Sequence, residues 1–107
     1  MLAIKRKNKT VKKETKTKTP KQIERHLKGV ANHRRIGILF LIAKQGGISV
    51  DIISMRTRCN IKTISAHLIR LENAGLIRKI NAGRMVCHEL SPYGRTIYNF
   101  LETFSHS

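Results

Sequence analysis

Apolar residues recur at helical spacing from about residue 20 onward. Thr19-Pro20 favours a helix start, since threonine can cap a helix and proline suits its first position, and an apolar stripe follows as far as Val30. Asn32 can cap a second helix, HRRIGILFLIAKQ, which a pair of glycines ends. Because apolar residues nearly encircle this second helix, we predict that it lies at the centre of the fold.

Two further segments continue the helical pattern. Ser49 can cap a short helix over VDIISMRT, and after a turn at residues 57–59 Asn60 can cap a fourth helix that stops at Gly75. One side of the fourth helix is expected to belong to the core, and it carries Ile61, Ile64, Leu68 and Leu71. The opposite side carries Lys62, Ala66, Ile69, Arg70 and Asn73, with Thr63 at its margin.

After Gly75 the pattern becomes extended. The runs LIRKI and MVCHEL flank the turn NAGR, which predicts a β-hairpin over residues 76–90. Ser91-Pro92 then opens a last helix with apolar residues at helical spacing. The predicted fold is mostly α with a small β-hairpin, in the order of four helices, hairpin and final helix, and it forms one domain over residues 20–107.

The charge of the chain is far from neutral and favours a polyanionic partner. The sequence holds 22 Lys and Arg against 6 Asp and Glu, a net charge of +16 with a pI near 10.9. Residues 1–19 hold eight basic residues and one acidic residue, with little apolar content, so we predict a disordered basic tail. Residues 20–107 hold fourteen basic and five acidic residues, so the domain is basic in its own right.

Several classes of protein are disfavoured by the sequence. Two cysteines, Cys59 and Cys87, are too few for a disulfide scaffold, and no apolar run reaches the length of a membrane span or a signal peptide. A cytoplasmic, nucleoid-associated protein that does not contact membranes is therefore expected. The sequence has no catalytic motif and few carboxylates, which argues against an enzyme.

Two helices joined by a tight turn and followed by a basic hairpin form the arrangement of a winged helix-turn-helix. The chain resembles the ArsR-type winged-helix transcriptional regulators through ANHRRIGILFLI, through the rhythm N-x-x-T-I-S-x-H-L-x-x-L-x-x-A-G-L-I from Asn60 to Ile77, and through INAGRMVCHELSPYGR. The rhythm is shared by winged helices as a class, MarR-like branches included. Arg58 departs from the family, which usually has glycine at this position in the turn, and Thr57 replaces a usual apolar residue.

The resemblance and the basic domain together predict a sequence-specific, double-stranded DNA-binding regulator, and the resemblance implies that it is a repressor. Residues 60–74 would enter the major groove as the recognition helix, while the hairpin, or wing, would touch the flanking backbone or minor groove. Lys62 and Arg70 can donate to phosphate or guanine, and Ala66 offers a small apolar contact. The expected DNA-contacting residues are Arg58, Asn60, Lys62, Thr63, Ser65, Ala66, His67, Arg70, Lys79 and Arg84.

No metal site, cofactor, or small-molecule or metal effector is expected. Zinc and related metals need three or four ligands brought together, whereas Cys59, Cys87, His67 and His88 occur singly. Cys59 precedes a helix N-terminus, where a thiol can become more reactive, but an inert cysteine in the turn is the favoured interpretation.

The first and last helices each carry an apolar stripe that so small a fold is not expected to absorb. We therefore expect a homodimer formed through Ile23, Leu27, Val30, Ile97, Phe100, Leu101 and Phe104. Two other hypotheses stay open: a basic chromatin-like or RNA-associated protein with little sequence specificity, and a winged helix that binds a protein partner.

Overall fold

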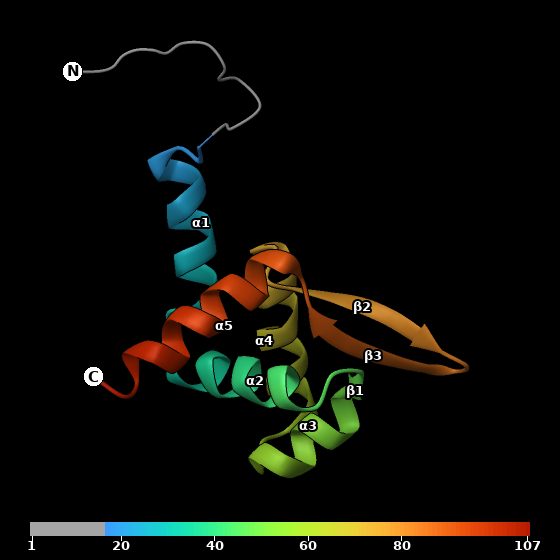
Figure 1. The fold of residues 1–107 in the computed structure, drawn as a ribbon. Coiled ribbons are helices and arrows are strands. Elements are labelled where there is room, and N and C mark those ends of the chain that lie inside the picture. The colour runs from blue at the N-terminus through green and yellow to red at the C-terminus, as the bar shows by residue number, and fades with distance from the viewer. Residues whose placement is uncertain (1–16) are drawn as a thin grey trace, which may run out of the picture.

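The computed structural model describes residues 17–107. The predicted basic tail lies outside the described residues except for its last three positions. The described residues form five helices and a three-stranded antiparallel sheet (Figure 1). The helices are α1 (Pro20–Val30), α2 (His33–Lys44), α3 (Val50–Thr57), α4 (Ile61–Asn73) and α5 (Pro92–Phe104), and the strands are β1 (Ile48–Ser49), β2 (Ile77–Ala82) and β3 (Met85–Leu90).

Each helix begins where the sequence placed its cap. Thr19 and Gln22 form a capping box at the start of α1, in which each side chain bonds the backbone N–H of the other. Asn32 accepts from two amides of α2, at 3.0 and 3.1 Å. Ser49, Asn60 and Ser91 cap α3, α4 and α5 in the same way. These side chains satisfy amides that have no partner within the helix, which is why the helix starts were predictable.

Helix α2 is the centre of the fold, as predicted. It packs against α1, α3, α4, α5 and β3, and its Ile38, Leu39 and Ile42 are fully buried. Ile64 and Leu71 of α4 complete the same core, with Ile53 and Leu76. The expectation for Ile61 was wrong: it is 46% exposed because it is the first residue of α4, where the helix extends beyond α2 and the rest of the core.

The sheet contains one strand that the sequence pattern did not predict. Strand β1 has two residues, and Ile48 pairs with His88 while Ser49 pairs with Cys87, so β3 lies between β1 and β2. The hairpin turn is also shorter than NAGR. Asn81 and Ala82 belong to β2, and only Gly83 and Arg84 connect the strands. Gly83 has φ +66° and Arg84 does not have a positive φ, the pattern of a type II′ turn.

Two glycines allow close contacts between elements. A Cβ on Gly29 of α1 would lie 2.1 Å from the Cβ of Ala74, so glycine lets the end of α1 cross the end of α4. A Cβ on Gly94 would lie 1.8 Å from the carbonyl oxygen of Leu76, which brings the start of α5 against the first residues of the hairpin. The first contact fixes how α1 crosses α4, and the second fixes how α5 sits against the start of the hairpin.

Candidate nucleic-acid interface

The outer face of α4 lies between α1 on one side and the wing, β2–β3, on the other. Lys62, Thr63, Ala66 and Arg70 are exposed on it, whereas Ser65 is half-buried. Ile69 is exposed as well and borders hollows on both sides of the helix, so it does not pack beneath the wing. The residues expected to face outward on this helix therefore share one accessible surface.

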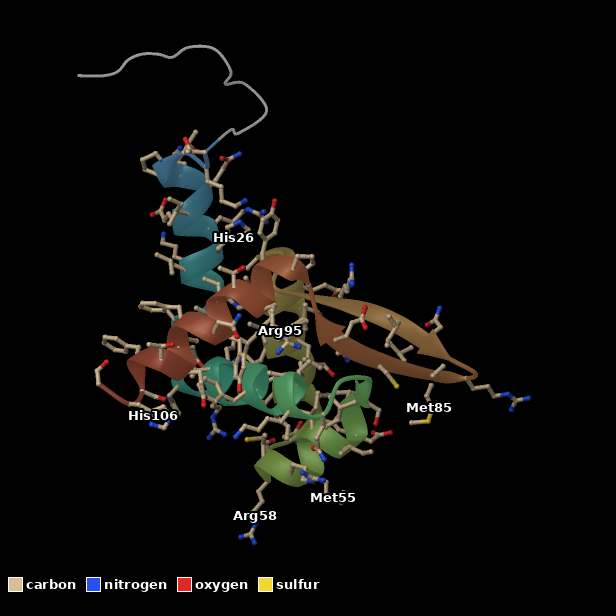
Figure 2. The ribbon with its side chains drawn as sticks, viewed as in Figure 1. His26, Met55, Arg58, Met85, Arg95 and His106 are labelled. Atoms are coloured by element: carbon tan, nitrogen blue, oxygen red, sulfur yellow. The ribbon has the colours of Figure 1, made fainter. Side chains whose placement is uncertain are left out.

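Asn60 and Arg58 shape the turn before α4. The side-chain oxygen of Asn60 accepts from the amide of Lys62 at 2.7 Å, so this residue orients the first turn of the helix. Arg58 ends α3 in the left-handed conformation, with φ 56° and ψ 38°, the region that glycine adopts most easily. Its side chain extends away from the molecule beyond α3 (Figure 2). The strained backbone thus carries an exposed cation.

The wing extends away from the helical body (Figure 1). Lys79 borders a hollow of about 280 Å³ between α4 and the wing, which Ser65 and Ile69 also line. Arg84 is exposed in the two-residue turn at the wing tip. Lys79 therefore joins the surface of α4, while Arg84 lies apart from it at the far end of the hairpin.

A cluster of cations surrounds His67 on the inner flank of α4. Arg35, which is buried, donates through Nη1 to Nδ1 of His67 at 3.3 Å and through Nε to the carbonyl of Gly29 at 2.6 Å. Burial, followed by the charges of Arg35, Arg34, Arg70 and His33, lowers the pKa of His67. Burial and Arg70 likewise lower the pKa of Arg35. The positive groups here raise one another's electrostatic energy.

This repulsion is not offset by nearby carboxylates. Within residues 17–107, the ion pairs are Lys28 with Glu24, Arg78 with Glu89 and His106 with Glu102, and none involves Arg34, Arg35 or Arg70. A cluster of like charges without counter-charges is relieved when an anion binds. The exposed guanidinium groups of Arg34 and Arg70 are therefore suited to contact a polyanion, whereas Arg35 is buried.

Helix α1 contributes further cations beside α4. A hollow of about 630 Å³ lies between the two helices, and Arg25, Lys28 and Arg70 line it together with Ala66 and Ile69. Arg25 also donates to the carbonyl of Asn73 at 2.5 Å, which holds it at the C-terminal end of α4. The basic surface therefore extends beyond the recognition helix and the wing.

The sequence interpretation missed Arg25, Lys28, Arg34 and Arg35. A signal for the last two was present, because His33-Arg34-Arg35 opens α2, where the helix dipole disfavours positive charge. Cations at that place indicate an anionic partner or a packing role. Arg25 and Lys28 gave no comparable signal, since their importance depends on how α1 crosses α4.

The two cysteines occupy different places. Cys59 is half-buried in the turn before α4, where Arg34 donates to its Sγ, and Cys87 is buried in β3. His88, next to Cys87, is buried too, and burial lowers its pKa. In the part of the chain that the structure describes, no three His, Cys, Asp or Glu side chains gather as a metal site would require. No helix of these residues is long and apolar enough to cross a membrane.

The apolar residues of the terminal helices divide into two groups. Phe100 and Phe104 of α5 are 57% and 64% exposed and stack on each other with ring centroids 5.6 Å apart. Ile23 and Leu27 are exposed on α1, which projects from the body (Figure 1). Ile97 and Leu101 are half-buried against the core. Val30 is 4% exposed and belongs to the core, so it offers almost no surface to a partner, contrary to expectation.

Comparison with known proteins identifies the fold. No protein-family model and no curated protein matches the chain. Among solved structures, the chain is similar to Mb0332 from Mycobacterium bovis, with 29% identity and a TM-score of 0.73, and the match covers 80% of each chain. That structure is a homodimeric winged helix-turn-helix DNA-binding domain, described as a possible ArsR-family transcriptional regulator. HlyU from Vibrio cholerae is 25% identical with a TM-score of 0.73, covering 81% of this chain and 95% of its own.

A more distant match shows the fold alone. FabT from Streptococcus pneumoniae, solved in complex with DNA, is 17% identical with a TM-score of 0.63, covering 79% of this chain and 66% of its own. The predicted order of helices and wing agrees with the winged-helix fold of these structures. The resemblance seen in the sequence is confirmed: this chain has the winged helix-turn-helix fold and is similar to ArsR-type transcriptional regulators.

Proposed function

We propose that this protein is a homodimeric, sequence-specific double-stranded DNA-binding transcriptional regulator that acts in the cytoplasm without catalysing a reaction. The observation that carries the proposal is the cluster of cations around His67, beside the exposed face of α4, without carboxylate partners among the described residues. DNA phosphates would relieve the repulsion within this cluster. Repression is the direction that the resemblance to ArsR-type regulators implies.

In this proposal, α4 enters the major groove and the wing follows the flanking backbone or minor groove. Lys62, Thr63, Ala66 and Arg70 face base edges, whereas Arg34, Arg58, Lys79 and Arg84 contact phosphates. The phosphate contacts set position and affinity, and the four residues of α4 supply sequence preference. Two subunits bind half-sites about one helical turn apart, roughly 34–36 Å between centres.

Selection of bound fragments from genomic DNA, followed by fluorescence anisotropy, tests the proposal. Lys62→Ala with Arg70→Ala is expected to remove most of the preference for selected over random DNA, because each good base contact contributes about 1–3 kcal/mol of discrimination. The matched control is Lys44→Ala with Arg95→Ala, which removes the same charge from the end of α2 and from α5. The control is expected to keep the preference.

Two other results would support different functions. Uniform weakening on every sequence by the Lys62 and Arg70 changes would indicate a basic chromatin-like or RNA-associated protein. Absence of any binding to DNA at moderate salt would indicate a winged helix that binds a protein partner. Either result would contradict the proposed readout by α4.

A further inference from the structure

The hollow between α1 and α4 is bordered by positive charge from both helices. Its volume is about 630 Å³, and Arg25 and Lys28 of α1 line it together with Arg70 of α4. Ala66 and Ile69 line it as well, and no Asp or Glu of residues 17–107 does so. All three cations are exposed. Three exposed cations around one hollow without a carboxylate favour an anionic occupant.

Helix α1 has two different faces, and this hollow lies on the charged one. Ile23 and Leu27, the residues expected in the dimer interface, do not border it and line apolar hollows elsewhere around α1. At about 100° per residue, Arg25 lies roughly 160–200° around the helix from these two side chains. A dimer formed through the apolar face of α1 is therefore compatible with a second contact made by its charged face.

Arg25 is fixed beside α4 and keeps donors for an anion. Its Nη1 donates to the carbonyl of Asn73 at 2.5 Å, and Gly29 lets α1 approach Ala74 closely. A guanidinium carries several N–H donors, so others remain after this bond is made. Because the side chain is already held in place, it loses less conformational freedom when it binds a phosphate than an unrestrained arginine would.

Lys28 is available for the same kind of partner. Within residues 17–107 its Nζ pairs with Oε2 of Glu24 at 3.4 Å, and the two side chains are 77% and 55% exposed. Exposed ion pairs contribute little free energy in water, so a phosphate can replace this carboxylate at small cost.

The outer face of α4 has cations on both flanks. In Figure 1, α4 lies between α1 and the wing, so Arg25 and Lys28 occupy the flank away from Lys79. A major groove is bordered by one phosphate backbone on each side. With 13 residues, α4 is about 20 Å long, which exceeds the groove width of about 12 Å. The C-terminal part of α4, where α1 crosses it, would therefore stand at the rim of the groove beside a backbone.

We infer that α1 is a second element that contacts the DNA backbone, in which Arg25 and Lys28 bind phosphates on the side of the major groove opposite the wing. The inference rests on the proposed entry of α4 into that groove. These contacts set affinity and orientation without reading bases, because phosphates are the same in every sequence. The wing and α1 then hold the two strands from opposite sides, with α4 between them.

The salt dependence of DNA binding by the full-length protein tests the contact, with fluorescence anisotropy on a mixed-sequence duplex. Arg25→Gln with Lys28→Gln should make the slope of log affinity against log salt shallower by about 1.8, since each phosphate contact contributes about 0.9. The affinity advantage of the unchanged protein should then shrink about 12-fold between about 50 and 200 mM salt. Lys44→Gln with Arg95→Gln removes the same charge from α2 and α5 and should leave the slope nearly unchanged.

Two single variants separate a phosphate contact from the bond between Arg25 and Asn73. Lys28→Gln breaks only the exposed pair with Glu24 among the described residues, so it should make the slope shallower by about 0.9 with an unchanged urea midpoint. Arg25→Lys keeps the charge and should retain the slope. A slope as shallow in Arg25→Lys as in Arg25→Gln would mean that Arg25 acts by holding α4, which would overturn its contact with phosphate.

Ethylation interference on a fragment selected from genomic DNA locates the contact. Arg25→Gln with Lys28→Gln should lose the phosphates on one side of the major groove, and Lys79→Gln should lose those on the other side. Loss of the same phosphates in both cases, an unchanged salt slope in the double variant, or a change in its sedimentation mass that places these residues in the dimer interface would each overturn the inference. Because the salt slope is measured on mixed-sequence DNA, a failure of this contact and a failure of sequence preference are separate results.

Discussion

Arg35 donates a hydrogen bond to Nδ1 of His67, which joins the start of the central helix to the middle of the recognition helix. The same guanidinium binds the carbonyl of Gly29 at the end of α1. Nδ1 accepts this bond, so a neutral His67 carries its proton on Nε2. One buried arginine therefore holds three helices together and keeps positive charge behind the outer face of α4.

Stability should fall as the pH is lowered from about 6.5, the ordinary histidine pKa in an unfolded chain. The pKa values of His67 and His88 are lowered in the folded protein, so the unfolded state binds more protons between the lowered values and 6.5. The urea midpoint should be highest above pH 6.5 and decrease progressively below it. His67→Gln should reduce this dependence, because it removes one of the two groups whose pKa is lowered. The opposite slope would contradict the assignment.

Arg58→Gly should stabilise the fold and weaken DNA binding. Arginine is in the left-handed region at this position, and glycine would relieve about 1 kcal/mol of backbone strain. Chemical denaturation should show the gain in stability, and anisotropy should show lower affinity with a salt slope shallower by about 0.9. Arg58→Ala removes the same charge without relieving the strain, so it should share only the loss of affinity. Unchanged affinity in both variants would exclude Arg58 from the interface.

Gly94→Ala should destabilise the protein strongly, because its Cβ would overlap the carbonyl oxygen of Leu76. A loss of about 3 kcal/mol or more is expected in thermal or urea unfolding. Gly37→Ala provides the matched control, since a Cβ there meets nothing within 4 Å and the position lies inside α2. That variant should gain about 0.5–1 kcal/mol from helix propensity. Similar effects of both changes would argue against the α5 contact described above.

Phe100→Glu combined with Phe104→Glu should produce a folded monomer. These two exposed rings form the largest apolar surface of α5, and carboxylates there would be costly to bury against a partner. Sedimentation should show the change in mass, with retained helical circular dichroism. Val30→Ala should instead cost about 2 kcal/mol of stability without changing the mass of the folded protein, since Val30 lies in the core. Dimers that persist after the double change would place the interface elsewhere.

Removal of residues 1–16 should lower affinity for all DNA sequences and flatten the salt dependence. This segment holds seven basic residues and one acidic residue. Each phosphate contact that is lost reduces the slope of log affinity against log salt by about 0.9. The truncation keeps Lys18 and the Thr19 cap of α1, so the fold should be preserved. An unchanged slope would mean that the segment takes no part in binding.

Local chemistry explains which parts of the fold could be predicted. Capping side chains such as Asn32 and Ser91 act on amides within three residues, so the sequence is sufficient to locate them. Strand β1 was missed because two residues are too short to show a period, and its strand conformation depends on pairing with β3, which is distant in the sequence. Ile61 and Val30 were misassigned because helical spacing defines a face of a helix but not where along it another element packs.

The same distinction, between features set by neighbouring residues and features set by tertiary packing, applies to the candidate site. The exposed residues of α4 were predictable from period and charge, whereas the cluster around His67 depends on how α1 and α2 cross α4. Arg25 and Lys28 enter the basic surface for the same tertiary reason.

Among residues 17–107, strand β2 has a free edge, because the strand order is β1-β3-β2 and no described strand lies beyond β2. A free edge can recruit a strand from another copy of the chain, and charged side chains are a common protection against such aggregation. Arg78 and Lys79 lie exposed on this edge. Lys79, which is proposed to contact DNA, is therefore also expected to keep unbound molecules from joining edge to edge, so a neutral replacement there puts solubility at risk together with affinity.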